Sequence, residues 1–244
     1  MYRNSRVSVV LPCYNEAHGL RQLLPDLPSC VDELIVVDNG SLDETRAVAT
    51  SYGAKVVVEE RRGVGYAYQR GLIHAAGDLI VCLDGDATYP VQAIPSLLDR
   101  CEQDQLDFLS GCRFPLISPD AMSLRNRGGN CLLSWAANGF FRLQLGDVMS
   151  GMWIIRRSSL PQLSFRLGGV PSCIEVKLSA FLNPRLRSAE AHISYGKRLG
   201  KSKLAPWRDG WQCLAFMWRW KQQWRASFTD VSVPTLGLHP SHLS

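Results

Sequence analysis

The amino-acid sequence predicts an α/β protein built on a mostly parallel sheet. From Arg6 to about Cys112, short runs rich in β-branched residues alternate with stretches of helical periodicity. The run at residues 79–83 contains no polar residue, as expected of a strand covered on both faces of a parallel sheet. With 46% hydrophobic and 20% charged residues, the 244-residue chain can form one large domain or two small ones.

The first half of the chain is expected to hold five strands joined by helices. The strands are expected in short runs, most of them rich in β-branched residues, at residues 7–11, 34–37, 55–58, 79–83 and 108–110. Leucines recur at helical spacing over residues 20–27, and residues 41–44 form a capping box expected to open a helix through Tyr52. Because right-handed crossovers place the loops after parallel strands on one edge, the loops after the first, second and fourth strands should share a cleft.

The alternation of strands and helices stops after Cys112. The expected elements of the second half are a helix at 124–145, a strand at 153–156, a helix at 174–182, a strand at 189–194 and a helix at 207–225. No linker rich in Gly, Ser or Pro divides the chain. We therefore predict one domain over residues 1–228, with functional halves at 1–112 and 113–228, and a loosely ordered tail at 229–244.

Two acids follow the apolar strand at residues 79–83. Asp84 and Asp86 flank Gly85 at the point where the strand ends. Ligands of open α/β sheets bind outside the carboxyl ends of the strands, where paired acids suit a divalent cation and its phosphate ligand. The alternative is a polar loop that caps the helix expected after Pro90, and this stretch alone favours neither interpretation.

Three other loops carry residues suited to a nucleotide. Glu16, in the loop 12–16, either stabilises the start of a helix or holds the sugar or base of a ligand. Asp38 ends a strand, where it either binds a ribose hydroxyl or base edge, or shapes the turn. Gly65, with Gly63, would let backbone amides approach a diphosphate, and Arg70 would add charge; the spacing does not fit a dinucleotide fingerprint.

In order and spacing, these four segments resemble the donor-binding half of the family 2 glycosyltransferases with the GT-A fold, a Rossmann-like architecture. The resemblance implies a nucleotide-sugar donor, UDP- or GDP-linked, and Mg²⁺ or Mn²⁺ as cofactor. It implies that Asp86 is the metal ligand, that Asp84 contacts the sugar and is a second candidate ligand, and that Gly65 and Arg70 lie near the diphosphate. The positions matching those that hold base and ribose are Pro12, Tyr14, Glu16 and Asp38.

The second half resembles the dolichyl-phosphate mannosyltransferase and polyprenyl-phosphate glycosyltransferase branch. The matching segments are residues 111–113, 129–130, 147–152, 174–175 and 195–204. This implies an inverting transfer of a hexose to a polyprenyl phosphate, with Arg198 at the lipid phosphate and Lys203 nearby. Thr88 stands where the branch has Gln, and the hydrophobic helices that many members carry after the basic loop are absent.

The expected chemistry is displacement at an anomeric carbon with a nucleoside diphosphate as leaving group. A cation at Asp86 would neutralise the diphosphate, and Arg113 is expected to assist on the same phosphates. A phosphate acceptor is already anionic and needs orientation more than a strong base. A hydroxyl acceptor needs a base; Asp147 is the first candidate, against a structural role in fixing the turn at residues 150–151. Glu175 is expected to anchor the basic loop by packing.

The chain's net charge of +5 is concentrated in one segment. Residues 197–225 hold eight Lys or Arg against one Asp, a net of +7, which leaves −2 elsewhere. A local patch favours a phosphate-bearing partner or an anionic membrane surface over nucleic acid. The Trp-rich pattern from Trp207 to Trp224 is typical of a membrane-interface helix, but equally of a helix that packs on its own core or on a second subunit.

No apolar run is long enough to cross a bilayer and the N-terminus does not resemble a secretory signal, so a cytoplasmic protein, peripheral on the inner face of the membrane, is expected. Two rival functions share the same donor site. One is a glycosyltransferase with a soluble or glycan hydroxyl acceptor, and the other is a non-catalytic nucleotide-sugar-binding protein. The sequence leaves open the sugar, the choice between UDP and GDP, and the oligomeric state.

Overall fold

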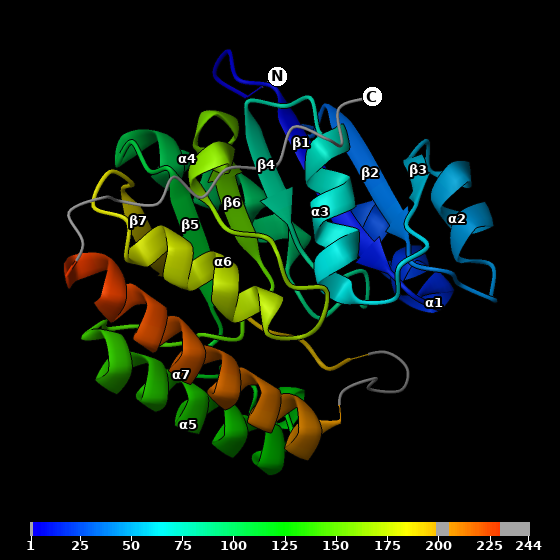
Figure 1. Cartoon of the computed structure of the whole chain (residues 1–244). Coiled ribbons are helices and arrows are strands. Elements are labelled where there is room, and N and C mark those ends of the chain that lie inside the picture. Colours follow the sequence, from blue (N-terminus) through cyan, green and yellow to red (C-terminus); the bar gives the residue numbers. More distant parts are fainter. Residues whose placement is uncertain (1, 199–204, 230–244) are drawn as a thin grey trace.

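The protein is an α/β structure with one seven-stranded sheet, as predicted (Figure 1). The computed structural model describes residues 2–198 and 205–229. The sheet order is β3-β2-β1-β4-β6-β5-β7, and β6 alone runs antiparallel to its neighbours. The strands are β1 Val7–Cys13, β2 Glu33–Asp38, β3 Lys55–Val58, β4 Leu79–Cys82, β5 Phe108–Cys112, β6 Trp153–Arg156 and β7 Ser188–His192.

Helices cover both faces of the sheet because its central strands are apolar on both sides. Every residue of β1 and β4 is buried, and alternate β1 side chains enter separate cores: Val9 lies in one and Val10 in the other. One core receives α1 Ala17–Leu23, α2 Thr45–Ser51 and α4 Ile94–Gln103. The other receives α3 Val64–His74 and α6 Ser172–Phe181.

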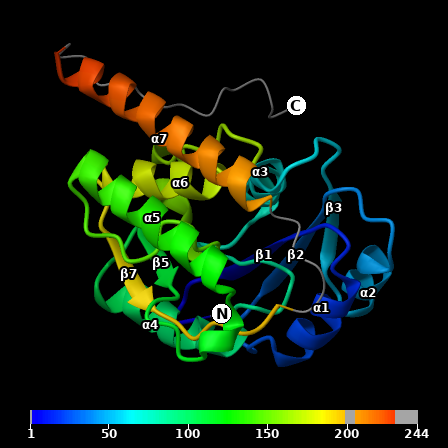
Figure 2. The same ribbon diagram turned by 90° about the horizontal axis from the view of Figure 1, so that it is seen from below.

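A third apolar cluster joins the helices of the second half. In both ribbon views α5 Leu124–Phe141 and α7 Pro206–Thr229 lie side by side, next to α6 (Figures 1 and 2). The described residues also form four short 3₁₀ helices, at Leu24–Asp26, Val91–Ala93, Pro119–Ala121 and Arg157–Gln162. Within residues 2–198 and 205–229, no helix is both long and apolar enough to cross a membrane.

Several predicted helix boundaries differ from the structure; the last helix, for example, ends at Thr229 rather than at residue 225. Two of the differences have a local reason. The capping box does not open α2, which begins at Thr45; the Ser41 hydroxyl instead accepts a hydrogen bond from the Asn15 amide at 2.9 Å, in the loop after β1. The helix expected to reach residue 145 ends at Phe141, because Arg142 adopts a left-handed conformation with φ of 57°.

The predicted convergence of the strand-end loops is confirmed. Asn15, after β1, accepts a hydrogen bond from the Leu42 amide at 2.7 Å, and the Asn39 amide, after β2, donates to Cys13 at 2.8 Å. The loop after β4 lies at the same edge, because β4 runs parallel to β1. This edge therefore holds Glu16, Asp38, Asp84 and Asp86, which follow or end the strands β1, β2 and β4. Of the expected tail, residues 230–244 lie outside the described part of the chain.

Candidate active site

The acid loop, residues 84–86, rests directly on α1. A Cβ on Gly19 of α1 would collide with the Gly85 carbonyl oxygen and lie 2.9 Å from the Cα of Asp86. Only glycine allows the helix to approach the loop backbone this closely. Helix α1 therefore packs directly against the backbone that carries Asp84 and Asp86.

Asp84 is held by a buried tyrosine. The Tyr68 hydroxyl, from α3, lies 2.9 Å from an Asp84 carboxylate oxygen and 3.2 Å from the Gly151 carbonyl oxygen. Burial, and then the charge of Asp86, raise the pKa of Asp84 to about 6. A buried acid whose pKa is raised by a neighbouring carboxylate lies in a site that a cation would stabilise.

Asp86 is 2% exposed and its two carboxylate oxygens have different partners. One accepts hydrogen bonds from the Thr88 amide at 3.1 Å and the Thr88 hydroxyl at 2.6 Å. The other pairs with the Arg198 guanidinium at 2.8 Å. Thr88, which departs from the resembled branch, thus orients the carboxylate.

Arg198 joins the two halves of the chain. Its second guanidinium nitrogen lies 2.7 Å from the Glu16 carboxylate, so that one side chain bridges Glu16 and Asp86. This contact brings the basic loop to the predicted donor residues. Lys203 lies outside the described residues.

The other nucleotide-side residues are engaged within the chain. Asp38 accepts bonds from the Ser41 amide at 3.0 Å and the Arg46 side chain at 2.7 Å. Burial alone would raise the pKa of Asp38, but the bonds from Ser41 and Arg46 bring it below its ordinary value. The Arg62 guanidinium stands 4.3 Å from the centre of the Tyr14 ring. Asp38 therefore shapes its turn, as the alternative interpretation held, and its contact with a ribose stays a prediction.

The glycine loop before α3 uses its amides for packing. The Gly63 amide donates to the Asn39 side chain at 2.8 Å, and the Gly65 amide donates to the Gly168 carbonyl oxygen at 2.9 Å. The expected approach of these amides to a diphosphate therefore has competition from contacts within the chain. Pro12 is buried in β1, and within the described residues no hydrogen bond or ion pair links the exposed Arg70 to the acid loop.

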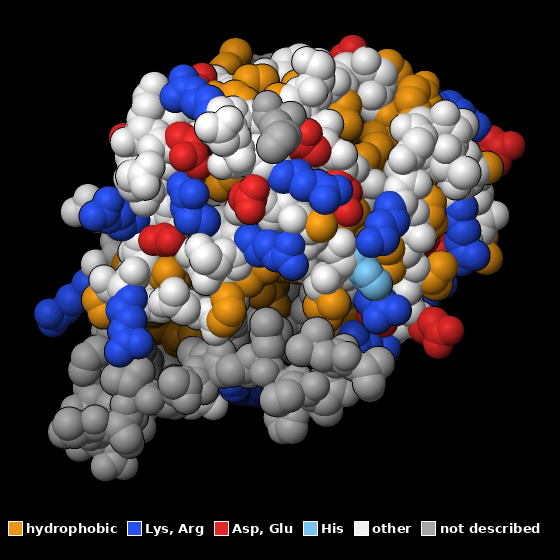
Figure 3. Space-filling model, turned by 90° about the horizontal axis from the view of Figure 1, so that it is seen from above, with side chains coloured by type: hydrophobic (Ala, Val, Ile, Leu, Met, Phe, Trp, Pro, Cys, Tyr) orange, Lys and Arg blue, Asp and Glu red, His pale blue; other side chains and the backbone are white. Residues whose placement is uncertain are grey.

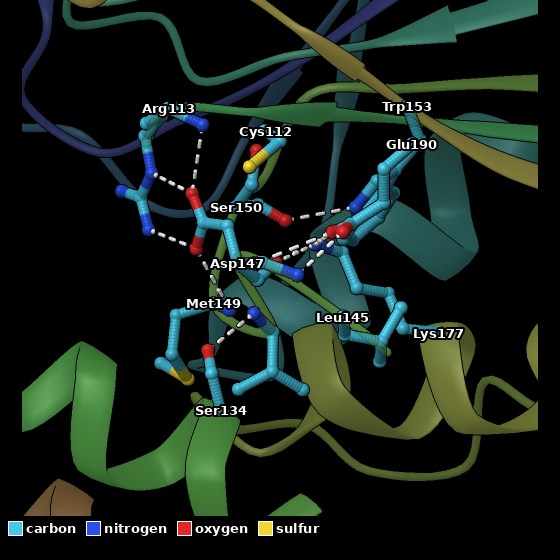
Figure 4. Close-up of polar contacts among 12 residues, drawn as sticks. Cys112, Arg113, Ser134, Leu145, Asp147, Met149, Ser150, Trp153, Lys177 and Glu190 are labelled. Carbon is cyan, nitrogen blue, oxygen red and sulfur yellow. Dashed lines mark hydrogen bonds and ion pairs between the residues drawn. The ribbon is translucent and has the colours of Figure 1, made fainter. Parts of the chain in front are cut away.

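The second half contains a buried charge cluster that the sequence did not predict as a unit (Figure 4). Arg113 and Asp147 form a two-pronged ion pair, with nitrogen–oxygen distances of 2.6 and 2.9 Å. Lys177 donates to the Asp147 carbonyl oxygen and lies 3.9 Å from Glu190. The Asn130 amide completes the cluster at 3.0 Å from Asp147.

The charges within this cluster indicate that it stabilises the fold rather than transferring protons. Burial alone would raise the pKa of Asp147, but the charge of Arg113 lowers it below its usual range. Burial lowers the pKa of Lys177. The expectation that Arg113 assists on the donor phosphates meets a physical obstacle, because its guanidinium is already paired with a buried carboxylate. The sole sequence signal for Lys177 is a lysine within the apolar run of α6.

Aromatic contacts connect the cluster to the basic loop. The Arg113 guanidinium lies 5.0 Å from the centre of the Tyr195 ring, which packs edge-on against Tyr89 at 5.3 Å. The Tyr89 hydroxyl in turn accepts a bond from the Gly151 amide at 2.7 Å. The cluster therefore supports the chain three residues before Arg198.

Glu175 is a packing anchor, as predicted, but for a different segment. Its carboxylate accepts hydrogen bonds from the Ser164 hydroxyl at 2.6 Å and from the amides of Arg166 and Leu167. These contacts fix the loop before α6 rather than the basic loop.

The acid loop has a donor set that suits a hard divalent cation. Asp84 and Asp86 supply carboxylate oxygens, and Mg²⁺ or Mn²⁺ commonly combines one or two carboxylates with substrate phosphates and water. The outward oxygen of Asp86 already faces a cation, the Arg198 guanidinium. Among the described residues, no group of three or more His, Cys, Asp or Glu side chains could hold a metal without such additional ligands.

The fold is of the GT-A type. A similar solved structure is glucosyl-3-phosphoglycerate synthase from Mycobacterium tuberculosis in complex with Mn²⁺ and UDP-glucose. Its TM-score is 0.73 at 23% identity, and the alignment covers 88% of this chain and 79% of that one. Residues 8–163 match the profile described as "Glycosyl transferase family 2". The chain belongs to the family 2 glycosyltransferases.

Several relatives share most of this chain. An uncharacterized glycosyltransferase of M. tuberculosis is 34% identical over 202 residues, covering 82% of this chain and 89% of the relative. A dolichyl-phosphate hexose transferase of Haloferax volcanii is 29% identical over 215 residues, with 86% and 91% covered. The low-salt glycan biosynthesis hexosyltransferase Agl6 of the same organism is 30% identical; the match covers 86% of this chain and 52%, about half, of that relative.

Proposed function

We propose that the protein transfers a hexose, with inversion, from a nucleotide sugar to a polyprenyl phosphate. The observation that carries this proposal is that Arg198 forms ion pairs with both Glu16 and Asp86. Arg198 lies in the loop that resembles the acceptor-phosphate loop of the family branch, and its two partners match donor-binding positions. The similarity to a dolichyl-phosphate hexose transferase supports the same acceptor class. In this proposal, residues 1–228 act as one catalytic domain.

The donor roles follow the positions of the side chains. Asp86 would hold a divalent cation, with Asp84 as second carboxylate or sugar contact, while Pro12, Tyr14, Glu16 and Asp38 would surround base and ribose. A bound cation would supply charge neutralisation for the departing diphosphate. Tyr68 and Thr88 would keep the two carboxylates fixed, which preorganises the site before the donor arrives.

The state of Asp147 supports a phosphate acceptor over a hydroxyl acceptor. A hydroxyl needs a base with a pKa near the working pH, and Asp147 was the candidate. Its carboxylate is fully buried, paired with Arg113, and held at a lowered pKa, so it is a poor proton acceptor. A phosphate monoester is already a nucleophilic anion, and Arg198 and Lys203 would orient it.

Two helices present an apolar surface that suits a membrane. On α7, Trp207, Trp211 and Trp218 are 84%, 73% and 55% exposed, and on α5 Trp135 is 74% exposed. The buried side of α7, including Cys213, packs toward α5, so these tryptophans lie outside the core. In sequence, the basic residues of the same helices are Arg125, Arg127, Arg208, Arg219, Lys221 and Arg225, and the single acid, Asp209, is buried.

We therefore propose peripheral attachment through α5 and α7. Exposed tryptophans beside cations favour the boundary of an anionic bilayer. In contrast, Figure 3 shows Lys and Arg interspersed with Asp and Glu over the face seen from above in Figure 1. Sedimentation with anionic liposomes should show binding that weakens with salt. Absence of liposome binding at low salt would contradict this attachment. If the protein instead forms dimers and does not bind liposomes, the alternative in which the helix packs on a second subunit is favoured.

A direct transfer assay tests the acceptor. The protein is incubated with Mn²⁺, radiolabelled UDP- or GDP-hexoses, and a short polyprenyl phosphate; label should enter the organic phase. Transfer to soluble sugars instead would favour the hydroxyl-acceptor rival. No transfer to either, despite donor binding, would favour the non-catalytic rival. The same panel of donors identifies the base and the sugar.

A further inference from the structure

Arg198 occupies the position that the proposed cation needs. Its guanidinium lies 2.8 Å from Asp86 and 2.7 Å from Glu16, and these carboxylates come from loops far apart in the sequence. The Arg198 side chain is 28% exposed, whereas that of Asp86 is 2% exposed. The arginine is thus the more solvent-accessible member of the pair.

The two oxygens of Asp86 leave one place for a cation. The inner oxygen accepts both bonds from Thr88. The outer oxygen receives Arg198. A divalent ion bound to the outer oxygen would lie within a few ångströms of the guanidinium, where like charges repel strongly in a partly buried site. The ion and the arginine therefore compete for one oxygen.

The present position of Arg198 leaves one of its donors unsatisfied. The Nε group is buried and has no acceptor in the part of the chain that the structure describes. An unpaired buried donor favours movement to a site where all five N–H groups can bond. The backbone just before it is fixed, because the Gly196 amide donates to the Thr88 carbonyl oxygen at 2.8 Å. Arg198 can therefore exchange partners without a shift of the backbone at Gly196.

We infer that Arg198 and a divalent cation exclude one another at Asp86, so that binding of metal and donor releases Arg198 to the acceptor phosphate. The inference rests on the proposed function, since it takes Asp86 as the metal ligand and Arg198 as the phosphate ligand. One residue then serves both sites in turn. Donor and acceptor binding become positively coupled, and the coupling is reciprocal.

Mn²⁺ affinity tests the exclusion without any turnover. The free ion is followed by electron paramagnetic resonance during titration of the wild-type protein, with and without UDP. Arg198→Ala should bind Mn²⁺ about tenfold more tightly, because the ion no longer displaces a charged partner. Arg185→Ala is the matched control, because it removes the same charge from an exposed position. Arg185 precedes β7, whereas Arg198 follows it. Unchanged or weaker Mn²⁺ binding by Arg198→Ala would overturn the inference.

Asp86→Asn separates this inference from the proposed function. If Asp86→Asn retains Mn²⁺ affinity, the proposed metal site is wrong. If it loses Mn²⁺ while Arg198→Ala equals the wild type, only the exclusion is wrong. Asparagine can still accept both bonds from Thr88, and unchanged melting temperatures would show that the variants are folded.

Acceptor binding supplies the second measurement. Geranyl phosphate should bind the wild type severalfold more tightly with Mn²⁺ and UDP than without them, as measured by calorimetry. Arg198→Lys keeps the charge but lacks the planar fork that spans two carboxylates, so it should show a smaller difference. Equal geranyl phosphate affinity with and without Mn²⁺ and UDP would contradict the coupling.

Discussion

Two buried carboxylates of this protein show opposite electrostatics. Burial would raise the pKa of both Asp84 and Asp147. Asp84 lies beside Asp86 and its pKa rises further, whereas Asp147 lies against Arg113 and its pKa falls below the ordinary value. An additional positive charge would therefore stabilise the ionised acid loop, whereas Asp147 is already stabilised by Arg113.

The arginine pairs at the two places differ in the same sense. Arg113 meets Asp147 with two parallel bonds, and their side chains are 8% and 0% exposed. Arg198 divides its bonds between Asp86 and Glu16 and leaves its Nε without an acceptor among the described residues. A two-pronged buried pair fixes the fold, whereas a divided and half-satisfied one can exchange partners.

The largest expected effect is on stability, from Arg113→Met. This change leaves Asp147 buried without its main partner, which should lower the free energy of unfolding by about 3–5 kcal/mol. Arg100→Met, which breaks the half-exposed pair with Asp104, is the control and should cost less than about 0.5 kcal/mol. Urea denaturation measures both. Equal effects of the two changes would show that the buried pair has no special structural role.

The second expected effect is on catalysis, from Asp86→Asn. Loss of the carboxylate should reduce kcat/KM about 10³-fold, about 4 kcal/mol of transition-state stabilisation, if this group holds the proposed cation. Stability should change little, because Asn retains an oxygen for Thr88. The transfer assay and a melting curve check both statements. Full activity of this variant would exclude the proposed role of Asp86.

The predictability of each region follows from the range of its contacts. Strands β3 and β6 have the predicted bounds, because short runs rich in β-branched residues specify strands locally, in β3 as in the antiparallel β6. The acid loop was found because a sheet's topology brings strand ends together whatever the details. Thus most of the fold and the donor edge of the site could be read from local pattern and connectivity.

The buried cluster depends on pairs that no local pattern reveals. Arg113 and Asp147 are 34 residues apart, and Lys177 reaches Asp147 from helix α6. Arg198 and Glu16 are separated by 182 residues. The exposed position of Trp135 on α5 was also not predicted, since only the presence of a helix was inferred for that segment. Side-chain partners of this kind depend on tertiary packing, which the sequence pattern does not specify.

A third test adds a Cβ atom to Gly19, where α1 contacts the acid loop. In Gly19→Ala the new Cβ would collide with the Gly85 carbonyl oxygen and displace Asp86. A shift of about 1 Å in a catalytic group can reduce activity about 10²-fold. Gly128→Ala, where a Cβ meets nothing within 4 Å, should keep full activity and a stable α5. If Gly19→Ala also keeps full activity, the close approach of α1 does not position the acids.

The smallest expected effect compares Asp84 with Asp147 through pH. Asp84 has a folded-state pKa of about 6, above its ordinary 3.8, so its ionisation destabilises the folded state increasingly as pH rises from about 4 to 6. Asp84→Asn should therefore gain stability relative to wild type over that range, by about 1 kcal/mol after allowance for solvent screening. Asp147 has a lowered pKa, so its contribution is present above pH 3.8 and is lost only on further acidification. Denaturation curves between pH 3 and 7 measure both variants, Asp84→Asn and Asp147→Asn. If the stability difference between Asp84→Asn and the wild type stays constant between pH 4 and 6, the charge of Asp84 does not destabilise the fold. The argument that a metal ion would stabilise the acid loop would then fail.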